Sequence, residues 1–194
     1  MKLVVGILSL LIFRAWAQAP ASDATCSPEI KKTLRSQEIL NRVSAGAKFL
    51  NLDCAVVTLP KGDQYVLAAI VLNSKTGMES FAVVFPFKGL GKDSKPVFQS
   101  PQLAFDLYPL WADEVTRLLF VEPVLTGTKM RFFLNGQHAP SLTRVMAYEL
   151  DFNKLEFKED RRRSWPMECG LLPKFYQDRD GQKRILLGAR SVPY

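Results

Sequence analysis

The sequence predicts an all-β protein of antiparallel hairpins, sandwich-like or blade-like, with one N-terminal helix. Three observations predict it: short apolar runs are separated by Gly-, Pro- and Asn-containing turns, two of these runs alternate apolar and polar residues, and only one segment carries helix-start signals. The chain has 194 residues, of which 47% are hydrophobic and 23% charged. These values suit a single β-rich domain over residues 28–194 and exclude collagen, coiled coil and wholesale disorder.

Residues 1–17 are expected to be an export signal. Lys2 provides a positive start, residues 3–13 form an apolar stretch, and Ala15-Trp16-Ala17 matches a signal-peptidase site before Gln18. As a helix the apolar stretch would rise only ~16 Å, against a hydrocarbon core of ~30 Å, so a buried N-terminal element is the better alternative to an export signal. We therefore expect a secreted or periplasmic protein with a flexible leader at 18–27 and no transmembrane segment in the mature chain.

The helix is expected to begin at Pro28. Ser27 is a suitable N-cap, proline suits the first helical position, and the segment would run to Val43 or Ser44, before Gly46. Its apolar residues fall on two opposite faces, with Ile30 and Leu34 on one and Ile39, Leu40 and Val43 on the other. The helix therefore either breaks near Ser36 or is packed on two sides.

The rest of the chain is expected to form short strands joined by tight turns. They are predicted at residues 54–59, 65–72, 81–87, 117–121, 129–134, 146–152, 155–158, 175–177 and 184–187. The pair 65–72 and 81–87 is apolar on both faces, so both faces should be covered. In 146–152, Glu149 and Asp151 alternate with apolar residues, which predicts one wet face. The punctuated segment 89–101 is expected to be a loop.

Two segments resemble strands of a β-propeller blade. Residues 111–121 (WADEVTRLLFV) and 144–159 (RVMAYELDFNKLEFKE) are similar to an inner strand and a later strand that hairpins back. A propeller needs several blades of about forty residues, so the resemblance implies a local blade-like meander.

The positive charge of the chain is concentrated at its C-terminal end. The formal net charge is +7, and residues 161–194 hold eight basic and three acidic residues, whereas residues 18–160 hold sixteen of each. The candidate binding residues are Arg161, Arg162, Arg163, Lys183 and Arg184. Such a segment attracts acidic partners, here an anionic glycan or a membrane surface; export argues against nucleic acid. The alternative is a solvated face, partly neutralised by Glu159 and Asp160.

Motifs for catalysis, cofactors and metals are missing from the sequence. A single histidine nearly excludes machinery that needs two, and we find no P-loop, G-x-G-x-x-G, G-x-S-x-G or H-E-x-x-H pattern. Asp178-x-Asp180-Gly181 begins like a calcium loop, but Tyr176 and Leu187 stand where an EF-hand needs carboxylates, so a hairpin turn is expected. No cofactor is therefore expected.

Three cysteines in an exported chain predict one disulfide and one free thiol. Cys26 and Cys169 lie in polar, turn-rich contexts and are the favoured pair. Cys54 begins an apolar strand and is expected to be the buried free thiol.

Two functions are consistent with these observations. The favoured one is a non-enzymatic exported binding protein that uses its basic C-terminal segment or an aromatic groove around Phe105, Tyr108 and Trp111. The alternative is a small secreted hydrolase with carboxylates at Glu168, Asp178 and Asp180. These acids are interleaved with arginines, which stabilise the ionised form, and a carboxylate mechanism needs one protonated acid.

Overall fold

The computed structural model describes residues 25–103, 114–124, 127–137, 142–168 and 171–194. The expected export signal at 1–17, most of the leader at 18–27, and the aromatic residues 105, 108 and 111 lie outside these residues. The all-β class is confirmed, because the described residues form antiparallel sheets with two short helices near the N-terminus.

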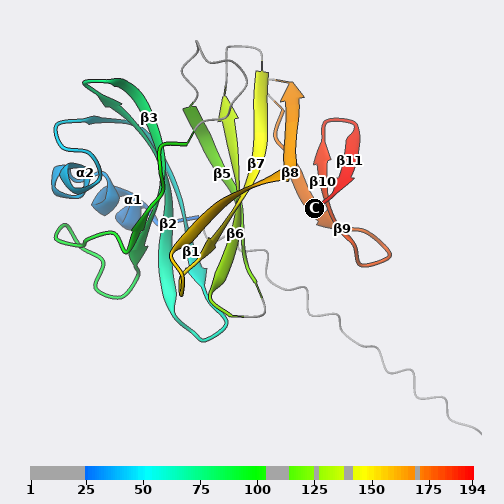
Figure 1. Cartoon of the computed structure of the whole chain (residues 1–194), viewed down its shortest axis with the longest axis horizontal. Coiled ribbons are helices and arrows are strands. Elements are labelled where there is room, and N and C mark those ends of the chain that lie inside the picture. The colour runs from blue at the N-terminus through cyan, green and yellow to red at the C-terminus, as the bar shows by residue number, and fades with distance from the viewer. Residues whose placement is uncertain (1–24, 104–113, 125–126, 138–141, 169–170) are drawn as a thin grey trace, which may run out of the picture.

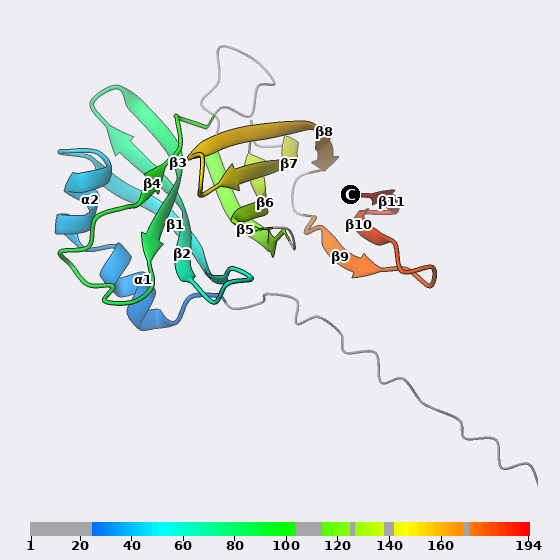
Figure 2. The same ribbon diagram turned by 60° about the horizontal axis from the view of Figure 1, so that its bottom comes forward.

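The described elements stack as helices, then three sheets, in four layers (Figures 1 and 2). The helices are α1 (Pro28–Leu34) and α2 (Gln37–Val43). The N-terminal sheet contains β1 (Lys48–Thr58), β2 (Gln64–Ser74), β3 (Gly77–Pro86) and β4 (Phe98–Gln99), in that order. The central sheet contains β5 (Glu114–Pro123), β6 (Lys129–Gln137), β7 (Leu142–Asp151) and β8 (Glu156–Glu168). The C-terminal sheet has the order β11 (Arg190–Pro193), β10 (Lys183–Leu187) and β9 (Lys174–Gln177).

The expected N-terminal helix is divided in two. Ser27 caps α1 by accepting a hydrogen bond from the Ile30 N–H at 3.3 Å, as its position predicts. Ser36 then caps α2 by accepting from the Ile39 N–H at 3.4 Å. Because the helix breaks near Ser36, apolar residues of both α1 and α2 face the N-terminal sheet. Of the two expected alternatives, a broken helix is therefore the correct one.

The N-terminal sheet is covered on both faces, as the apolar pair of strands predicts. One face packs on α1 and α2 through Leu34, Ile39 and Leu40, which are at most 2% exposed. The opposite face packs on the central sheet, where Leu67 meets a cluster that includes Phe132. Strand β2 is therefore buried from Val66 to Leu72.

The face of the central sheet that was predicted to be wet is covered over part of its length, which corrects that prediction in part. Met146, Tyr148 and Leu150 point into the core shared with the N-terminal sheet. On the opposite face Val145 and Ala147 are fully buried under the C-terminal sheet. Apolar and polar residues do alternate along β7, but the C-terminal sheet covers the part of the second face that holds Val145 and Ala147. Only the part near Glu149, whose side chain is 30% exposed, stays open to solvent.

The two larger sheets meet differently at their two edges. At one edge β4 and β8 approach through Phe98 and Phe157, whose ring centroids lie 5.7 Å apart. At the other edge β1 lies beside β5, and the Asp53 side chain accepts a hydrogen bond from the Leu118 N–H at 3.1 Å. This second edge carries the site described below.

Two strands lie outside the expected set. Strand β4 lies within the segment expected to be a loop, 89–101, and pairs with β3 for only two residues. Strand β11 follows the turn around Gly188 and pairs with β10. Within the described part of the chain, no helix has the length and apolar character needed to cross a membrane.

Candidate functional site

The arginine triplet forms a bulge in a strand. Strand β8 pairs with β7 through Asp160 opposite Ala147 and then Ser164 opposite Met146. Residues 161–163 are therefore extra residues on one side of the ladder. Arg163 pairs with the Asp160 carboxylate, and the Arg161 Nε lies 3.8 Å from a Glu159 carboxylate oxygen. Two of the three arginines thus pair with the two acids that precede them in the sequence.

The other two predicted basic residues lie in the C-terminal sheet and have partners of their own. Lys183 pairs with Glu122 on β5. Arg184 donates from Nε to the Ser191 hydroxyl at 2.8 Å, and its Nη1 lies 3.6 Å from an Asp178 oxygen. The charges of Lys183 and Arg184 are thus partly offset by neighbouring acids.

Of the three acids in the hydrolase alternative, Asp178 stabilises a turn. One oxygen of Asp178 accepts hydrogen bonds from the N–H groups of Asp180 and Gln182, at 3.0 and 2.9 Å, and the other pairs with Arg184. Gly181 has a φ of +80°, which suits the expected hairpin turn. The Glu168 side chain lies outside the described residues. Among the residues that are described, no cluster of three His, Cys, Asp or Glu could hold a metal.

The disulfide joins Cys26 to Cys54, so the predicted pairing of Cys26 with Cys169 is wrong. The Cα atoms of the bonded pair lie 5.5 Å apart. Thr25 bridges Ala55 in antiparallel fashion, and the Cys26 N–H donates to the Cys54 carbonyl at 3.1 Å. The chain therefore runs along β1 before it enters α1, which brings Cys26 onto the buried side chain of Cys54. The prediction that Cys54 is buried is confirmed. The prediction that it is a free thiol is wrong, because it is bonded to Cys26.

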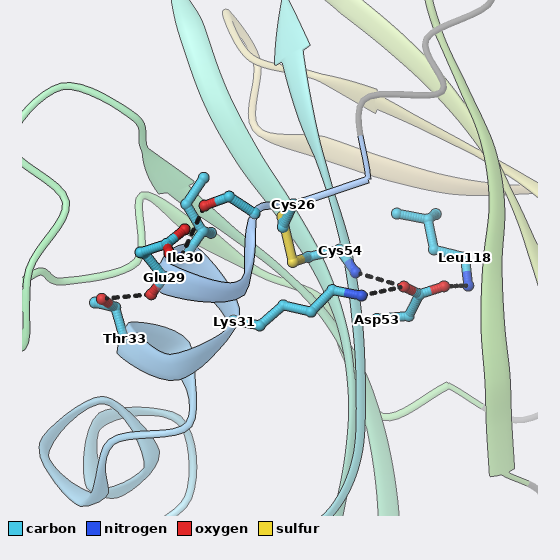
Figure 3. The surroundings of a disulfide bond; sticks show 9 residues. Cys26, Glu29, Ile30, Lys31, Thr33, Asp53, Cys54 and Leu118 are labelled. Atoms are coloured by element: carbon cyan, nitrogen blue, oxygen red, sulfur yellow. Dashed lines mark hydrogen bonds and ion pairs between the residues drawn. A yellow bond between two sulfur atoms is a disulfide. The ribbon is translucent and has the colours of Figure 1, made fainter.

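Asp53, next to the disulfide, bridges three elements (Figure 3). Its Oδ1 accepts from the Cys54 N–H at 3.0 Å and lies 3.6 Å from the Lys31 Nζ on α1. Its Oδ2 accepts from the Leu118 N–H on β5. Both carboxylate oxygens are thus engaged, and the negative charge is offset by Lys31.

Two adjacent hollows open around this bridge; we call them together the basic hollow. The first, of about 560 Å³, lies beside α1 and is lined by Cys26, Lys31, Lys32 and Arg35, among others. The second, of about 590 Å³, lies between β1, β5 and the start of β9. Lys31 lines both, and the disulfide contributes one cysteine to each.

Cations dominate the lining of the basic hollow. Among the lining residues that the structure describes, the cations are Lys31, Lys32, Arg35, Arg117 and Lys174, and the one acid is Asp53. Apart from Lys31, which faces Asp53, these cations form no ion pair with any described residue. Concave positive surfaces concentrate the field and attract anions, so the hollow can bind an acidic group.

The second hollow also has an apolar wall. Leu118 and Val121 are buried on the β5 side, while Leu172 on the β9 side is 56% exposed. Phe175 is partly buried and packs on the cluster beneath the C-terminal sheet. The wall and the cations therefore face the same space.

Sequence reasoning missed this site because its cations are scattered along the chain. Arg117 and Lys174 come from different sheets, and only the tertiary fold brings them together. One signal was available: Lys31 and Arg35 are four residues apart, which places both on one face of a helix.

The comparisons with known proteins add no family to this geometry. No protein-family model matches the chain, and neither a curated protein nor a solved structure is significantly similar to it.

Proposed function

We propose that this chain is an exported, non-enzymatic binding protein and that the basic hollow binds an anionic ligand. The observation that carries the proposal is the charge imbalance of the lining: its described residues include five cations and one acid, and that acid already has three partners. A carboxylate or phosphate group entering the hollow would form charge-assisted hydrogen bonds without having to displace a resident acid from Arg117 or Lys174.

Two further features support the proposal. A disulfide between Cys26 and Cys54 is typical of oxidising compartments and agrees with the export expected from residues 1–17. The same disulfide, together with the Asp53 bridge, ties α1, β1 and β5 to one another, so Lys31, Lys32 and Arg117 stand on cross-linked elements. A pre-organised frame lowers the entropic cost of binding.

The contacts of Asp178 argue against the hydrolase alternative. A carboxylate mechanism needs one acid that is free to give up and regain a proton. The Asp178 carboxylate instead accepts two backbone hydrogen bonds and pairs with Arg184.

A nuclear magnetic resonance titration with inorganic pyrophosphate tests the proposal. At low salt, we expect amide shifts at Lys31, Leu118 and Lys174, with their loss at high salt because exposed charges are screened. The variant R117Q should weaken binding by about tenfold, since a hydrogen bond to a charged group is worth about 1.5–3 kcal/mol.

The control for this titration is K75Q, which removes an exposed cation in the turn between β2 and β3. It should leave the affinity unchanged. Shifts confined to the β8 bulge, or no shifts at all, would contradict the proposal.

A further inference from the structure

We propose that the ligand of the basic hollow is a single-chain amphipathic acid, a free fatty acid, with its carboxylate on Arg117 and Lys174 and its chain along the apolar wall. This inference rests on the proposed function and adds the class of ligand to it.

The first argument is the composition of the second hollow. Besides its cations it is lined by Leu118, Leu119 and Val121 from β5, by Leu172 from the segment that leads into β9, and by Phe175 from β9 itself. A site for inorganic phosphate or a sugar acid needs polar partners around the whole ligand, whereas this one offers cations on one part and aliphatic carbon on the other. Sites for small ligands commonly combine an apolar lining with a few polar groups that orient the ligand.

The second argument is the exposure of an apolar side chain that lines the hollow. Leu171 and Leu172 are consecutive, and they are 41% and 56% exposed. Leu172 belongs to the lining, so apolar surface is left in water beside Arg117 and Lys174. An aliphatic chain laid against it removes that surface from water, at about 25 cal/mol for each Å² buried.

The third argument is size. The second hollow holds about 590 Å³, within the range of roughly 300–1,000 Å³ that is typical of pockets for small organic ligands. A long polyanion would lie across the molecule and would draw on many cations outside the hollow. Several of the described cations on β8 and β10 instead pair with acids, as Arg163 does with Asp160 and Lys183 with Glu122.

The charge around the hollow selects the acid over a neutral lipid. Asp53 is held by Lys31 and by two backbone N–H groups, so it does not compete for Arg117 or Lys174. A neutral headgroup would leave these two cations without a counter-charge when the chain covers the wall, which costs free energy because burial removes their water.

The test uses the mature full chain and sodium decanoate below its micelle-forming concentration, with acetate, decyl maltoside and anionic phospholipid vesicles as the other probes. Binding is measured by calorimetry and located by amide shifts. We expect decanoate to bind at least about tenfold more tightly than acetate, because burial of methylene groups adds to the same carboxylate contact. The shifts should fall at Leu118, Leu172 and Lys174.

Two variants separate the parts of the site. L172S should weaken decanoate several-fold and leave pyrophosphate unchanged, whereas R117Q should weaken both. Matched controls are L155S, which removes another leucine that is 59% exposed, and K75Q; neither should change the affinity.

Each other outcome overturns the inference. Equal affinity for decanoate and acetate means that the hollow recognises the anionic group alone, and the proposed function then stands without its ligand class. Equal binding of decyl maltoside means an apolar patch without charge selection, and binding of vesicles but not of monomeric decanoate means a membrane surface. If no anion shifts the residues of the hollow, the proposed function fails as well.

Discussion

The β8 bulge and the basic hollow are both rich in cations, but they differ in where their counter-charges come from. In the bulge, three consecutive arginines directly follow Glu159 and Asp160, and Arg161 and Arg163 pair with those two acids. In the hollow the cations come from α1, β5 and β9, and Asp53, the one acid among its described lining residues, already pairs with Lys31. Cations that are consecutive in the sequence can therefore be neutralised by neighbouring acids. Cations that are far apart in the sequence can instead meet in space without such acids.

The C-terminal sheet teaches the same lesson. Lys183 and Arg184 raise the net charge of the last segment, yet Glu122 and Asp178 pair with them. The surplus counted along the sequence thus overstates the charge that this sheet presents to a partner. What decides whether a surface can bind an anion is the number of cations that lack an acidic neighbour in space.

The largest effect is expected from breaking the frame of the hollow. In the double variant C26A/C54A, the free energy of unfolding should fall by roughly 3–4 kcal/mol, because the disulfide closes a loop between residues 28 positions apart. Denaturant unfolding measures this. Anion binding in the hollow should weaken in parallel, while the β8 bulge stays intact. A variant as stable as the parent would contradict the structural role of the bond.

Replacing Asp53 tests whether this acid reduces the affinity of the hollow for anions by neutralising Lys31. The D53N variant should bind pyrophosphate more tightly, because Lys31 loses its counter-charge. It should also lose about 1–2 kcal/mol of stability, since the bond from the Leu118 N–H and the bond from the Cys54 N–H cannot both be kept at full strength by an amide. Exposed Asp63, in the turn after β1, supplies the control D63N. Unchanged affinity in D53N would show that Asp53 does not set the charge of the hollow.

For comparison with Asp53, Asp151 is a carboxylate whose partners come from the turn that follows it and from the start of β6 and the residue before it. Burial raises its pKa, but hydrogen bonds from the Asn153 and Lys154 N–H groups and from the Thr128 hydroxyl, with the Lys129 charge, outweigh that and leave the pKa below its ordinary value. A lowered pKa in the folded state means that the stabilisation is complete above about pH 4 and is lost as the pH falls through the folded-state pKa.

The D151N variant should therefore be less stable than the parent at pH 6, and the difference should shrink toward pH 3. Denaturant unfolding at a series of pH values follows it. A difference that is independent of pH would argue that the charge of Asp151 does not contribute.

The smallest effect is expected at the arginine triplet. The variant R161S/R162S keeps Arg163, which pairs with Asp160, and should change stability by no more than about 0.5 kcal/mol. Its affinity for pyrophosphate should change less than twofold, against about tenfold for R117Q. An effect as large as that of R117Q would move the site to the bulge and reverse the comparison.

What the sequence could predict was local. The helix start at Ser27 and Pro28, the two-sided burial of β2, and the hairpin around Gly181 follow from residues within a few positions of one another. Periodicity and capping are short-range effects, so a linear reading captures them.

What it could not predict depends on which elements meet. The bulge in β8 is a matter of register against β7, the covering of Val145 depends on the C-terminal sheet, and the hollow needs α1, β5 and β9 together. The error in the disulfide has the same origin. The β-bridge between Thr25 and Ala55 places Cys26 beside Cys54, and no local sequence pattern predicts that bridge.

The position of the disulfide in the chain also bears on how the protein acquires it. Chains are made from the N-terminus onward, and domains begin to fold as they emerge. Cys26 and Cys54 are close in sequence and flank only α1, α2 and the first part of β1, so both are present long before Cys169 is synthesised. Closing a short loop costs less entropy than closing a long one. The order of synthesis and the shortness of the loop therefore both favour the native pair over any pairing with Cys169, and the frame of the basic hollow is secured before β5 and β9 arrive to complete it.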